Sequence, residues 1–514
     1  MIGRISIALA LLCLLTSESS AQGVQSFQIP AANQSSLPNS NSVSVIAVGG
    51  DTLWAGTGNG LSFTSGDGST WNHFAGTASF DDRPLAAIAV FNDAVWASVA
   101  YTEGKGSSAV AVGGGLHYST DHGLTWSYVP QPVDVGTIDT LQYGINKIPA
   151  LAITVPQQNV TYDIALSADE VWIASFAGML RKSTDLGGTW ERVVLPPDGL
   201  SSIAPTDTLD FALSPTSGSL GLQGNLNHRV FAVKIASDSS IWVGTAGGIN
   251  KSTDGGVSWV KFNHQNQLSP ISGNFVVGIA EQVLPSKRLI WAATVNALDE
   301  DEVQGVSYTD NDGLSWKTTL LGERAHNISF KDSIVYVATN RGLFRSTDFG
   351  NSWILTGTIA DPMSGQSFAQ SEIYAVGAIG DTIWIGGPEG VAYTIDAPGE
   401  LFGQRWKIFR TYEAVGTSRT TYSFPSPFSP GDEVVRLHYS TSGLNGGVTI
   451  KIFDFAMVPV KTLLQNADRS STIEHDEIWD GRDDYGRIVP NGVYFYRLEI
   501  GGTDPIWGKI YVIQ

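Results

Sequence analysis

The sequence is poor in cysteine and in charge. Its only cysteine, Cys13, lies near the N-terminus, so the remainder of the 514 residues forms no disulfide and offers no catalytic thiol. Charged residues make up only 15% of the chain, with 30 Lys plus Arg against 49 Asp plus Glu. The net charge of −19 argues against nucleic acid as a partner, because that affinity comes from clustered cations that neutralise phosphates.

Long apolar runs and metal-binding motifs are also missing. After the N-terminal segment, no stretch approaches the ~20 apolar residues that a membrane span needs. The eight histidines show no His-x-x-x-His or His-Glu-x-x-His spacing, and no phosphate-binding glycine loop precedes a helix. We therefore expect no transmembrane segment, no metal and no cofactor.

The N-terminus has the pattern of a secretory signal peptide. One positive charge in Met1–Arg4 precedes an apolar stretch, Ile5–Leu15, and the small residues Ser19–Ala21 provide a cleavage site. Residues 1–21 are therefore predicted to be removed. The mature protein is expected to be secreted or to lie on the outer cell surface.

Tryptophan and glycine are abundant, and 13 of the 15 tryptophans fall at two positions of a repeated unit. The first position lies in a short strand of the type Ile-Trp-x-Gly-Thr, and the second closes a polar turn of the type Ser-x-Asp-x-Gly-x-Thr-Trp. The strand position is occupied by Trp54, Trp96, Trp172, Trp242, Trp291, Tyr336 and Trp384. The turns end at Trp71, Trp126, Trp190, Trp259, Trp316, Trp353 and Trp406.

Four short strands in each of seven units predict an all-β fold, a seven-bladed β-propeller over residues 22–410. The turn resembles the Asp-box (BNR) motif of sialidases, sortilin-type receptors, xyloglucan hydrolases and photosystem-assembly propellers. That resemblance implies a fold rather than an activity. We expect a structural role, in which the Asp accepts N–H groups of its own turn and the Trp packs between blades. The strongest copies contain Asp121, Asp185, Asp254, Asp348, Trp126, Trp190, Trp259 and Trp353.

Long insertions distinguish the units. The separation between the two aromatic positions is 17 residues in three units but 30 in the second and 25 in the fifth. Further long connections span residues 130–160, 196–228 and 357–370. In a four-stranded blade these segments lie at the end opposite the Asp boxes, so we predict that this end of the propeller carries the binding surface.

The C-terminal part lacks the repeated unit and has a different sequence pattern. A polar linker is predicted at 411–421, followed by short strands over 422–514 that read as a small β-sandwich. The segments Tyr422–Pro430, Trp479-Asp480-Gly481 and Gly492–Tyr496 resemble the Ig-like domain of flagellar hook-capping proteins and the sorting domains of type IX secretion cargo. The resemblance implies sorting by an outer-membrane secretion machinery.

Two classes of function remain open. The first is a non-catalytic module that binds a glycan or an extracellular protein through its long loops, with Tyr101, Tyr143 and Arg341 as candidate contacts. These tyrosines either stack on a ligand or fold their own loops inward. The second is a glycoside hydrolase, sialidase-like or polysaccharide-cleaving.

The hydrolase would use three arginines at the channel mouth, Arg83, Arg229 and Arg324, which otherwise form loop ion pairs with neighbouring acids. A segment similar to one that supplies a sialidase arginine carries Gln28 instead. The acidic residues 299–302 either hold a cation or form a solvated loop. We favour binding over hydrolysis.

Overall fold

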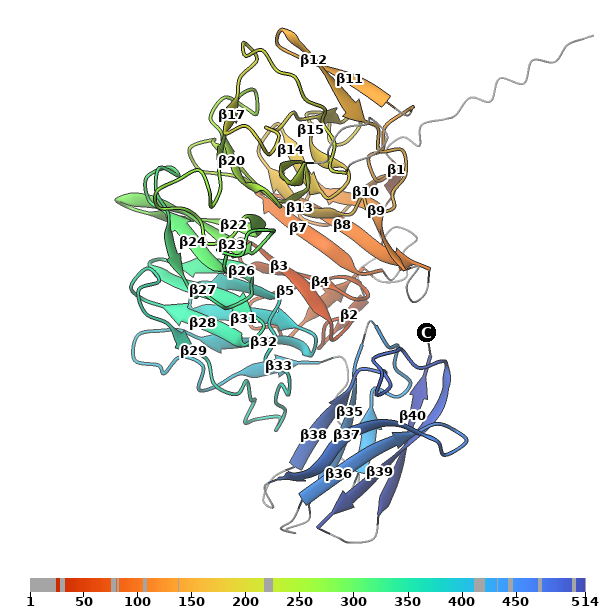
Figure 1. Ribbon diagram of the computed structural model, residues 1–514. Coiled ribbons are helices and arrows are strands. Elements are labelled where there is room, and N and C mark those ends of the chain that lie inside the picture. Colours follow the sequence, from red (N-terminus) through yellow and green to blue (C-terminus); the bar gives the residue numbers. More distant parts are fainter. Residues whose placement is uncertain are drawn as a thin grey trace, which may run out of the picture.

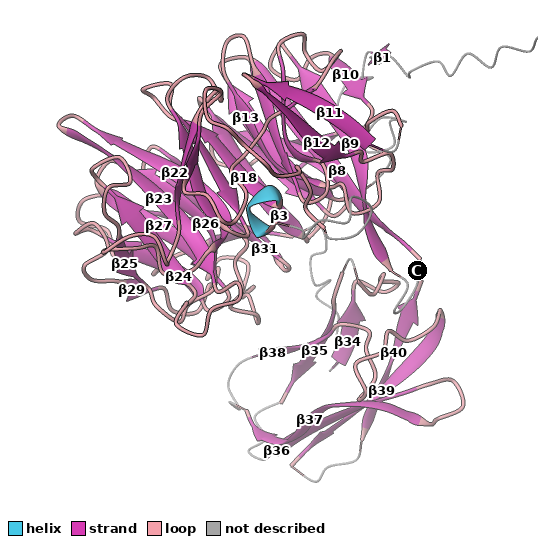
Figure 2. Cartoon of the chain, turned by 45° about the horizontal axis from the view of Figure 1, so that its top comes forward, coloured by secondary structure: helices cyan, strands magenta, loops and turns pink. Residues whose placement is uncertain are grey.

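The computed structural model describes residues 25–27, 33–74, 80, 83–104, 109–136, 138–216, 225–410, 421–431, 433–441, 447–469, 474–501 and 505–513. The predicted signal peptide, Gln28 and all of the predicted linker except its last residue lie outside this part. Within it the chain is built from strands, with one short 3₁₀ turn at Leu226–His228 (Figure 2). No helix among these residues is long and apolar enough to cross a membrane.

Seven antiparallel sheets follow one another along the described chain, each with four consecutive strands. Three of them gain a fifth strand at the outer edge: β2 (Asn33–Ser35), β1 (Gln25–Phe27) and β17 (Ser202–Ile203). The four basic strands of the seven sheets are, in order, β3–β6 (Val43–Gly49, Thr52–Thr57, Gly60–Ser65, Trp71–His73), β7–β10 (Leu85–Phe91, Ala94–Glu103, Val110–Ser119, Trp126–Val129), β13–β16 (Thr161–Leu166, Val171–Ser175, Met179–Ser183, Glu191–Arg192), β18–β21 (Val230–Ile235, Ile241–Thr245, Gly248–Ser252, Trp259–Phe262), β22–β25 (Phe275–Leu284, Lys287–Val295, Gly305–Thr309, Lys317–Thr319), β26–β29 (Ala325–Lys331, Ile334–Thr339, Gly342–Ser346, Ile354–Leu355) and β30–β33 (Ala375–Ile379, Thr382–Gly387, Gly390–Ile395, Lys407–Phe409).

The sheets form a closed ring. The first strand of each sheet contacts the first strand of the next, and β30 of the last sheet contacts β3 of the first. Figure 1 shows the two ends of this succession side by side. This radial arrangement around a shared centre is that of a β-propeller.

The repeated aromatic residues fill the spaces between sheets. Each of seven buried clusters combines the second-strand aromatic residue of one sheet with the Asp-box tryptophan of the next. Trp54 and Trp126, for example, meet edge to face with ring centroids 6.4 Å apart. Because a sheet cannot bury both faces alone, these aromatic pairs join the sheets into one core.

The Asp-box turns are held by their own side chains. In the turn of the third sheet, Asp185 accepts the N–H of Thr189 at 2.8 Å and the hydroxyl groups of Thr189 and Ser183 at 2.7 and 2.8 Å. These hydrogen bonds lower the pKa of the Asp185 carboxyl. The same bonds recur at Asp121, Asp254 and Asp348.

Two of the long insertions pack against each other, a contact that the sequence did not predict. Residues 130–160 form a hairpin, β11 (Ile138–Tyr143) and β12 (Asn146–Leu151), which packs against the 196–228 connection. The Leu151 N–H donates to the Leu213 carbonyl at 3.0 Å, and the Leu213 N–H donates to the Pro149 carbonyl at 2.8 Å. Their apolar residues join the core between the third and fourth sheets, because burial there removes them from water.

Two further sheets follow at the C-terminus. One contains β34 (Thr421–Phe424), β35 (Val435–Ser440) and β38 (Glu474–Trp479). The other has the order β37 (Pro459–Asp468), β36 (Gly447–Phe453), β39 (Gly492–Ile500) and β40 (Ile506–Val512). Residues of both sheets share one apolar core.

A buried carboxylate joins the C-terminal sheets to the ring. Glu389, in the turn between β31 and β32, pairs with Arg410 at 3.1 Å and with Arg436 of β35. It also accepts the backbone N–H groups of Ala369 and Gln370. Burial lowers the pKa of Arg410 to about 9, with a further contribution from Arg436.

Candidate functional site

The central channel opens into a cavity of about 460 Å³ where the first strands begin. We call this opening the channel mouth, and its polar or aromatic lining consists of Ser44, Tyr162, Asp163, Arg324, His326, Asn327 and Tyr374. The remaining lining is small and aliphatic. The first strands therefore supply the lining, and residues outside the Asp-box motif decide its chemistry.

A backbone irregularity places these side chains. The first strands of six sheets shift register near their start, at the second residue in five (Ser44, Ala86, Tyr162, Phe231 and His326) and at the third in β22 (Val277). Tyr374, immediately before β30, stands at the equivalent position of the seventh sheet. Because a bulge leaves one residue unpaired and re-aims its side chain, this position recurs around the channel mouth.

Tyr162 lines one side of the mouth and belongs to a cluster of aromatic rings whose phenylalanines are not part of the described lining. Phe231 lies 5.4 Å from Tyr162 and 4.6 Å from Phe275, measured between ring centroids. Arg229 stacks 5.5 Å from the Phe176 centroid and donates to the Pro215 carbonyl at 2.8 Å. Tyr162 remains 39% exposed, so its ring is accessible from the cavity.

The other side is polar. His326 lies 3.7 Å from Glu372, and Tyr374 donates to Glu372 at 3.1 Å. Burial and the Glu372 carboxylate raise the pKa of Tyr374 to about 12, so its hydroxyl remains a donor at neutral pH. Arg324 is exposed beside them, and among the described residues its guanidinium forms no ion pair within 4 Å.

Asp163 is the one carboxylate that lines this cavity in the described chain. It is partly buried and accepts the N–H groups of Ile164 and Val233, both at 2.9 Å. Burial raises its pKa to about 6. Asn327 in β26 plays the same part, accepting the N–H of Val376 in the next sheet at 3.0 Å.

The three candidate arginines do not converge on the cavity. Arg324 lines it, whereas Arg83 stacks 4.1 Å from the ring of Tyr101 and Arg229 stacks on Phe176. The neighbouring acids expected for Arg83, at positions 81 and 82, lie outside the described residues. Glu323 pairs with Arg341 rather than with Arg324.

The other sequence candidates are also engaged within the protein. Tyr143 is only 8% exposed, and its hydroxyl donates to the Val257 carbonyl at 2.6 Å, so it folds its own hairpin inward. Tyr101 supports Arg83 and donates to Glu103 at 3.3 Å. Arg341 is exposed and forms an ion pair with Glu323.

The acidic residues 299–302 line a separate cavity of about 790 Å³ between the fourth and fifth sheets. Glu302 is turned inward and accepts the N–H groups of Asn274 and Ala297 at 2.9 and 2.6 Å. Asp299 accepts the amide of Gln265 at 3.0 Å. In the described part of the chain, no three His, Cys, Asp or Glu residues are grouped as a metal site would require.

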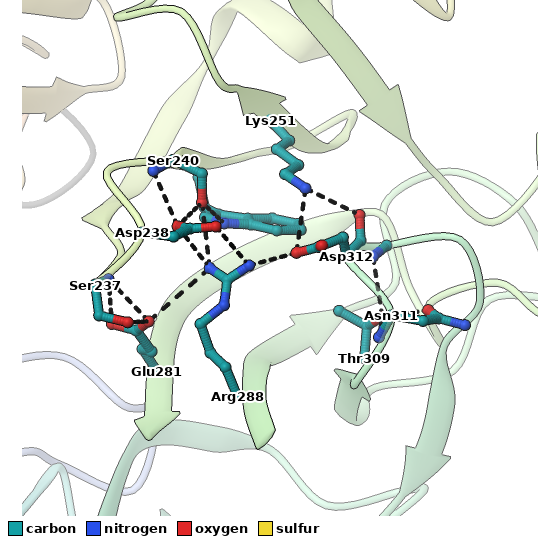
Figure 3. A network of polar contacts seen from close by, with 11 residues as sticks. Ser237, Asp238, Ser240, Lys251, Glu281, Arg288, Thr309, Asn311 and Asp312 are labelled. Atoms are coloured by element: carbon teal, nitrogen blue, oxygen red, sulfur yellow. Dashed lines mark hydrogen bonds and ion pairs between the residues drawn. The ribbon is translucent and has the colours of Figure 1, made fainter. Parts of the chain in front are cut away.

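At the opposite end, the channel is bordered by a polar clamp (Figure 3). Arg288 lies between Asp238, at 2.8 Å, and Asp312, with Glu281 at 3.9 Å. Lys251 approaches Asp312 to 3.3 Å. Two cations thus face three carboxylates, and the network ties the fourth sheet to the fifth.

The sequence missed the ring of mouth residues. These residues belong to no motif: Tyr162, Phe231 and His326 occupy the second position of their first strands, and Tyr374 immediately precedes β30 at the equivalent place. Aligning the units on that strand would have placed them in one column. It would not have identified the bulge that turns them toward the channel.

No family model and no curated protein matches the sequence. Among solved structures, the chain is similar to a GH74 enzyme of Niastella koreensis, with 13% identity over 95% of this chain and 74% of that one and a TM-score of 0.48. It is similar to PorZ, a surface component of the type IX secretion system of Porphyromonas gingivalis, with 14% identity over 91% of this chain and a TM-score of 0.33. The chain spans 65% of that PorZ structure.

A third similar structure is YCF48 from Cyanidioschyzon merolae. The identity is 16%, the match covers 73% of this chain and 98% of that one, and the TM-score is 0.38. The class of protein defined by the strand pairing and the closed circuit of sheets is an all-β propeller followed by two further sheets.

Proposed function

We propose that the chain is an extracellular seven-bladed β-propeller of the Asp-box type that binds a glycan or protein at its channel mouth without catalysing a reaction. The observation that carries this proposal is the lining of the mouth. The ring of Tyr162 stands on one side, and the guanidinium of Arg324, the imidazole of His326 and the phenol of Tyr374 stand on the other. Concave sites with apolar walls and a few polar groups are the usual form of a binding site.

The hydrolase alternative has less support. Glycosidases commonly place two carboxyl groups about 5–9 Å apart. The described lining of the mouth contains one carboxyl group, that of Asp163, and this group accepts two backbone N–H groups. The arginines on which a sialidase-like site would depend are divided between stacking on Tyr101, stacking on Phe176 and the mouth itself.

Screening the purified chain on a glycan array and against chromogenic glycosides tests the proposal. We expect saturable binding without turnover, weakened at least tenfold by Arg324→Ala or Tyr162→Ala. Arg482→Ala, in the C-terminal part, is the matched control and should bind as the wild type does. Turnover that Arg324→Ala abolishes would replace the binding proposal with the hydrolase.

The C-terminal sheets are proposed to be an Ig-like sandwich that serves as a sorting domain for export across the outer membrane, after the general export pathway has removed residues 1–21. The motifs in Tyr422–Pro430 and Gly492–Tyr496 support this role. Deleting residues 422–514 should leave the propeller in the periplasm. Export of the truncated chain at the wild-type level would reduce the sandwich to a spacer.

A further inference from the structure

The outer face of the sheet β37–β36–β39–β40 carries rings and cations that its core does not use. Side chains alternate along β36 and β39, so Ile450, Ile452 and Tyr496 point into the core. The opposite positions point outward, and they include Lys451, Phe453, Phe495, Arg497, Trp507, Lys509 and Tyr511. We call these seven residues, with Phe455 in the adjoining turn, the aromatic sheet face. The strands that bear it lie in the lower half of Figure 1.

The rings of this face are accessible although they contact one another. Trp507 is 44% exposed and lies 5.5 Å from Phe453, and Phe455 is 77% exposed and lies 6.3 Å from Phe495, measured between centroids. Burying exposed aromatic surface is favourable, and large exposed apolar patches commonly mark interaction sites. The face therefore has the properties of a binding platform.

Its charge is opposite to that of the whole chain. Lys451, Arg497 and Lys509 stand among the rings, and Glu499 on the same strand pairs with Arg497. Lys451 pairs in register with Arg497, and Lys509 with Phe495. In a protein of net charge −19, this local excess of cations favours an anionic partner.

The arrangement of cations among aromatic rings favours a hydrated anionic polymer over an acidic protein surface as the partner. The core of a protein–protein interface is depleted in charge, because a buried ammonium group loses its hydration. Here Lys509 stands between Trp507 and Tyr511 on β40, and Lys451 stands next to Phe453 on β36. A hydrated polymer that alternates anionic groups with flat apolar surfaces could contact the cations and the aromatic rings together. The ammonium groups would then keep their hydration.

We infer that the aromatic sheet face binds an acidic polysaccharide. Sugar rings would lie on Trp507, Phe453 and Phe495, since their polarised C–H groups are attracted to the negative face of an aromatic ring. Carboxylate or sulfate groups of the sugars would pair with Lys451, Arg497 and Lys509. Neighbouring strands are about 4.8 Å apart, which is comparable with the length of one pyranose unit, so successive sugars meet successive strands.

Affinity electrophoresis of the full chain in gels containing alginate tests this inference, with dextran as the neutral comparison. Alginate should retard the wild type and dextran should not. Trp507→Ala should weaken binding at least tenfold, and Lys451→Gln combined with Lys509→Gln should weaken it and reduce its dependence on NaCl. Thermal unfolding of each variant checks that it folds.

Two variants serve as matched controls. Tyr485 is 84% exposed and stacks with Arg487 in the same domain, at 5.1 Å, but lies on the loop after β38. Tyr485→Ala should leave alginate binding unchanged. Arg324→Ala should also leave it unchanged, which separates this site from the channel mouth.

Several results would overturn the inference. These are the absence of retardation by both alginate and chondroitin sulfate, equal retardation by dextran, and wild-type retardation of folded Trp507→Ala. Preferential binding of oligo-dT or of anionic phospholipid vesicles would assign the face to another partner. Self-association abolished by Trp507→Ala would make it an interface between copies of this chain.

Discussion

Trp71 of the first sheet and Trp384 of the seventh lie edge to face, with ring centroids 6.2 Å apart and ring planes at 85°. The same pairing, a second-strand ring against the Asp-box ring of the following sheet, joins Trp242 to Trp316 at 6.2 Å. The first and seventh sheets are thus joined by the same packing of two tryptophans that joins the fourth sheet to the fifth. Among the described residues, no strand crosses from the first sheet to the seventh.

Because Trp384 helps to close the ring, we predict that Trp384→Ala strongly lowers the free energy of unfolding. Both indoles are buried, and replacing a buried large side chain with Ala costs roughly 3–5 kcal/mol. Trp242→Ala at an interior interface should cost a similar amount of unfolding free energy in denaturant titrations. Tyr485→Ala, at an exposed position, should cost little. A loss below about 1 kcal/mol for Trp384→Ala would contradict closure by this pair.

The Asp-box turns predict that Asn replaces Asp better than Ala does. In the fifth sheet Asn311 already occupies the position, accepting the N–H of Ser315 at 3.0 Å and the hydroxyl of Thr309 at 2.8 Å. Asp185→Ala should lower the unfolding free energy by about 1.5–3 kcal/mol, because its donors lose a charged acceptor. Asp185→Asn should lose less than half of that amount. Equal losses in denaturant titrations would contradict the structural role.

His228 predicts a specific sensitivity to acid. It is buried against Ser214 and Leu195, and burial lowers its pKa from 6.5 to about 4. The unfolded chain therefore binds the proton more readily. Stability should fall by about 1.4 kcal/mol per pH unit between pH 6.5 and 4 on account of this group, and then level off.

Denaturant titrations of the wild type and His228→Gln at pH 7, 6 and 5 measure this effect. The difference in unfolding free energy between the two should shrink or change sign as the pH falls, because glutamine does not titrate. Parallel pH profiles would show that folding does not lower the pKa of His228.

Asp163 should affect stability in the opposite direction from His228, and Asp163→Asn tests this. Burial raises the pKa of Asp163 to about 6, so the carboxylate destabilises the fold above pH 6 and this penalty is relieved as the pH falls toward 3.8. Asn327 shows that an amide satisfies the equivalent N–H group. The variant should be more stable than the wild type at pH 8 by up to about 3 kcal/mol, with the advantage disappearing near pH 4. A pH-independent difference between the two proteins would contradict this account.

Glu389→Gln should loosen the link between the ring and the C-terminal sheets. The substitution leaves Arg410 and Arg436 without their buried carboxylate, a change that typically costs 3–5 kcal/mol. Glu323→Gln, which breaks the exposed pair with Arg341, should cost less than about 1 kcal/mol and is the control. Limited proteolysis near residues 411–421 should become faster only in Glu389→Gln. Unchanged proteolysis would show that Glu389 does not fasten the two parts.

The sequence alone determined the succession of sheets. Period-two strands, turn glycines and the two tryptophan positions are local signals, and each sheet is built from consecutive strands, so the repeat could be read without tertiary information. The Asp-box hydrogen bonds are local as well. Asp185 and its partners Ser183 and Thr189 lie within one turn, which is why spacing alone predicted them.

Only the tertiary structure decided what surrounds the channel and where the long insertions lie. Tyr162, His326 and Tyr374 line the cavity from different sheets, and Tyr162 and His326 stand at bulges that the sequence pattern does not encode. The 130–160 insertion packs against a connection far along the chain, because their apolar residues bury one another at that junction. Such contacts depend on pairing between distant segments, and no local spacing specifies that pairing.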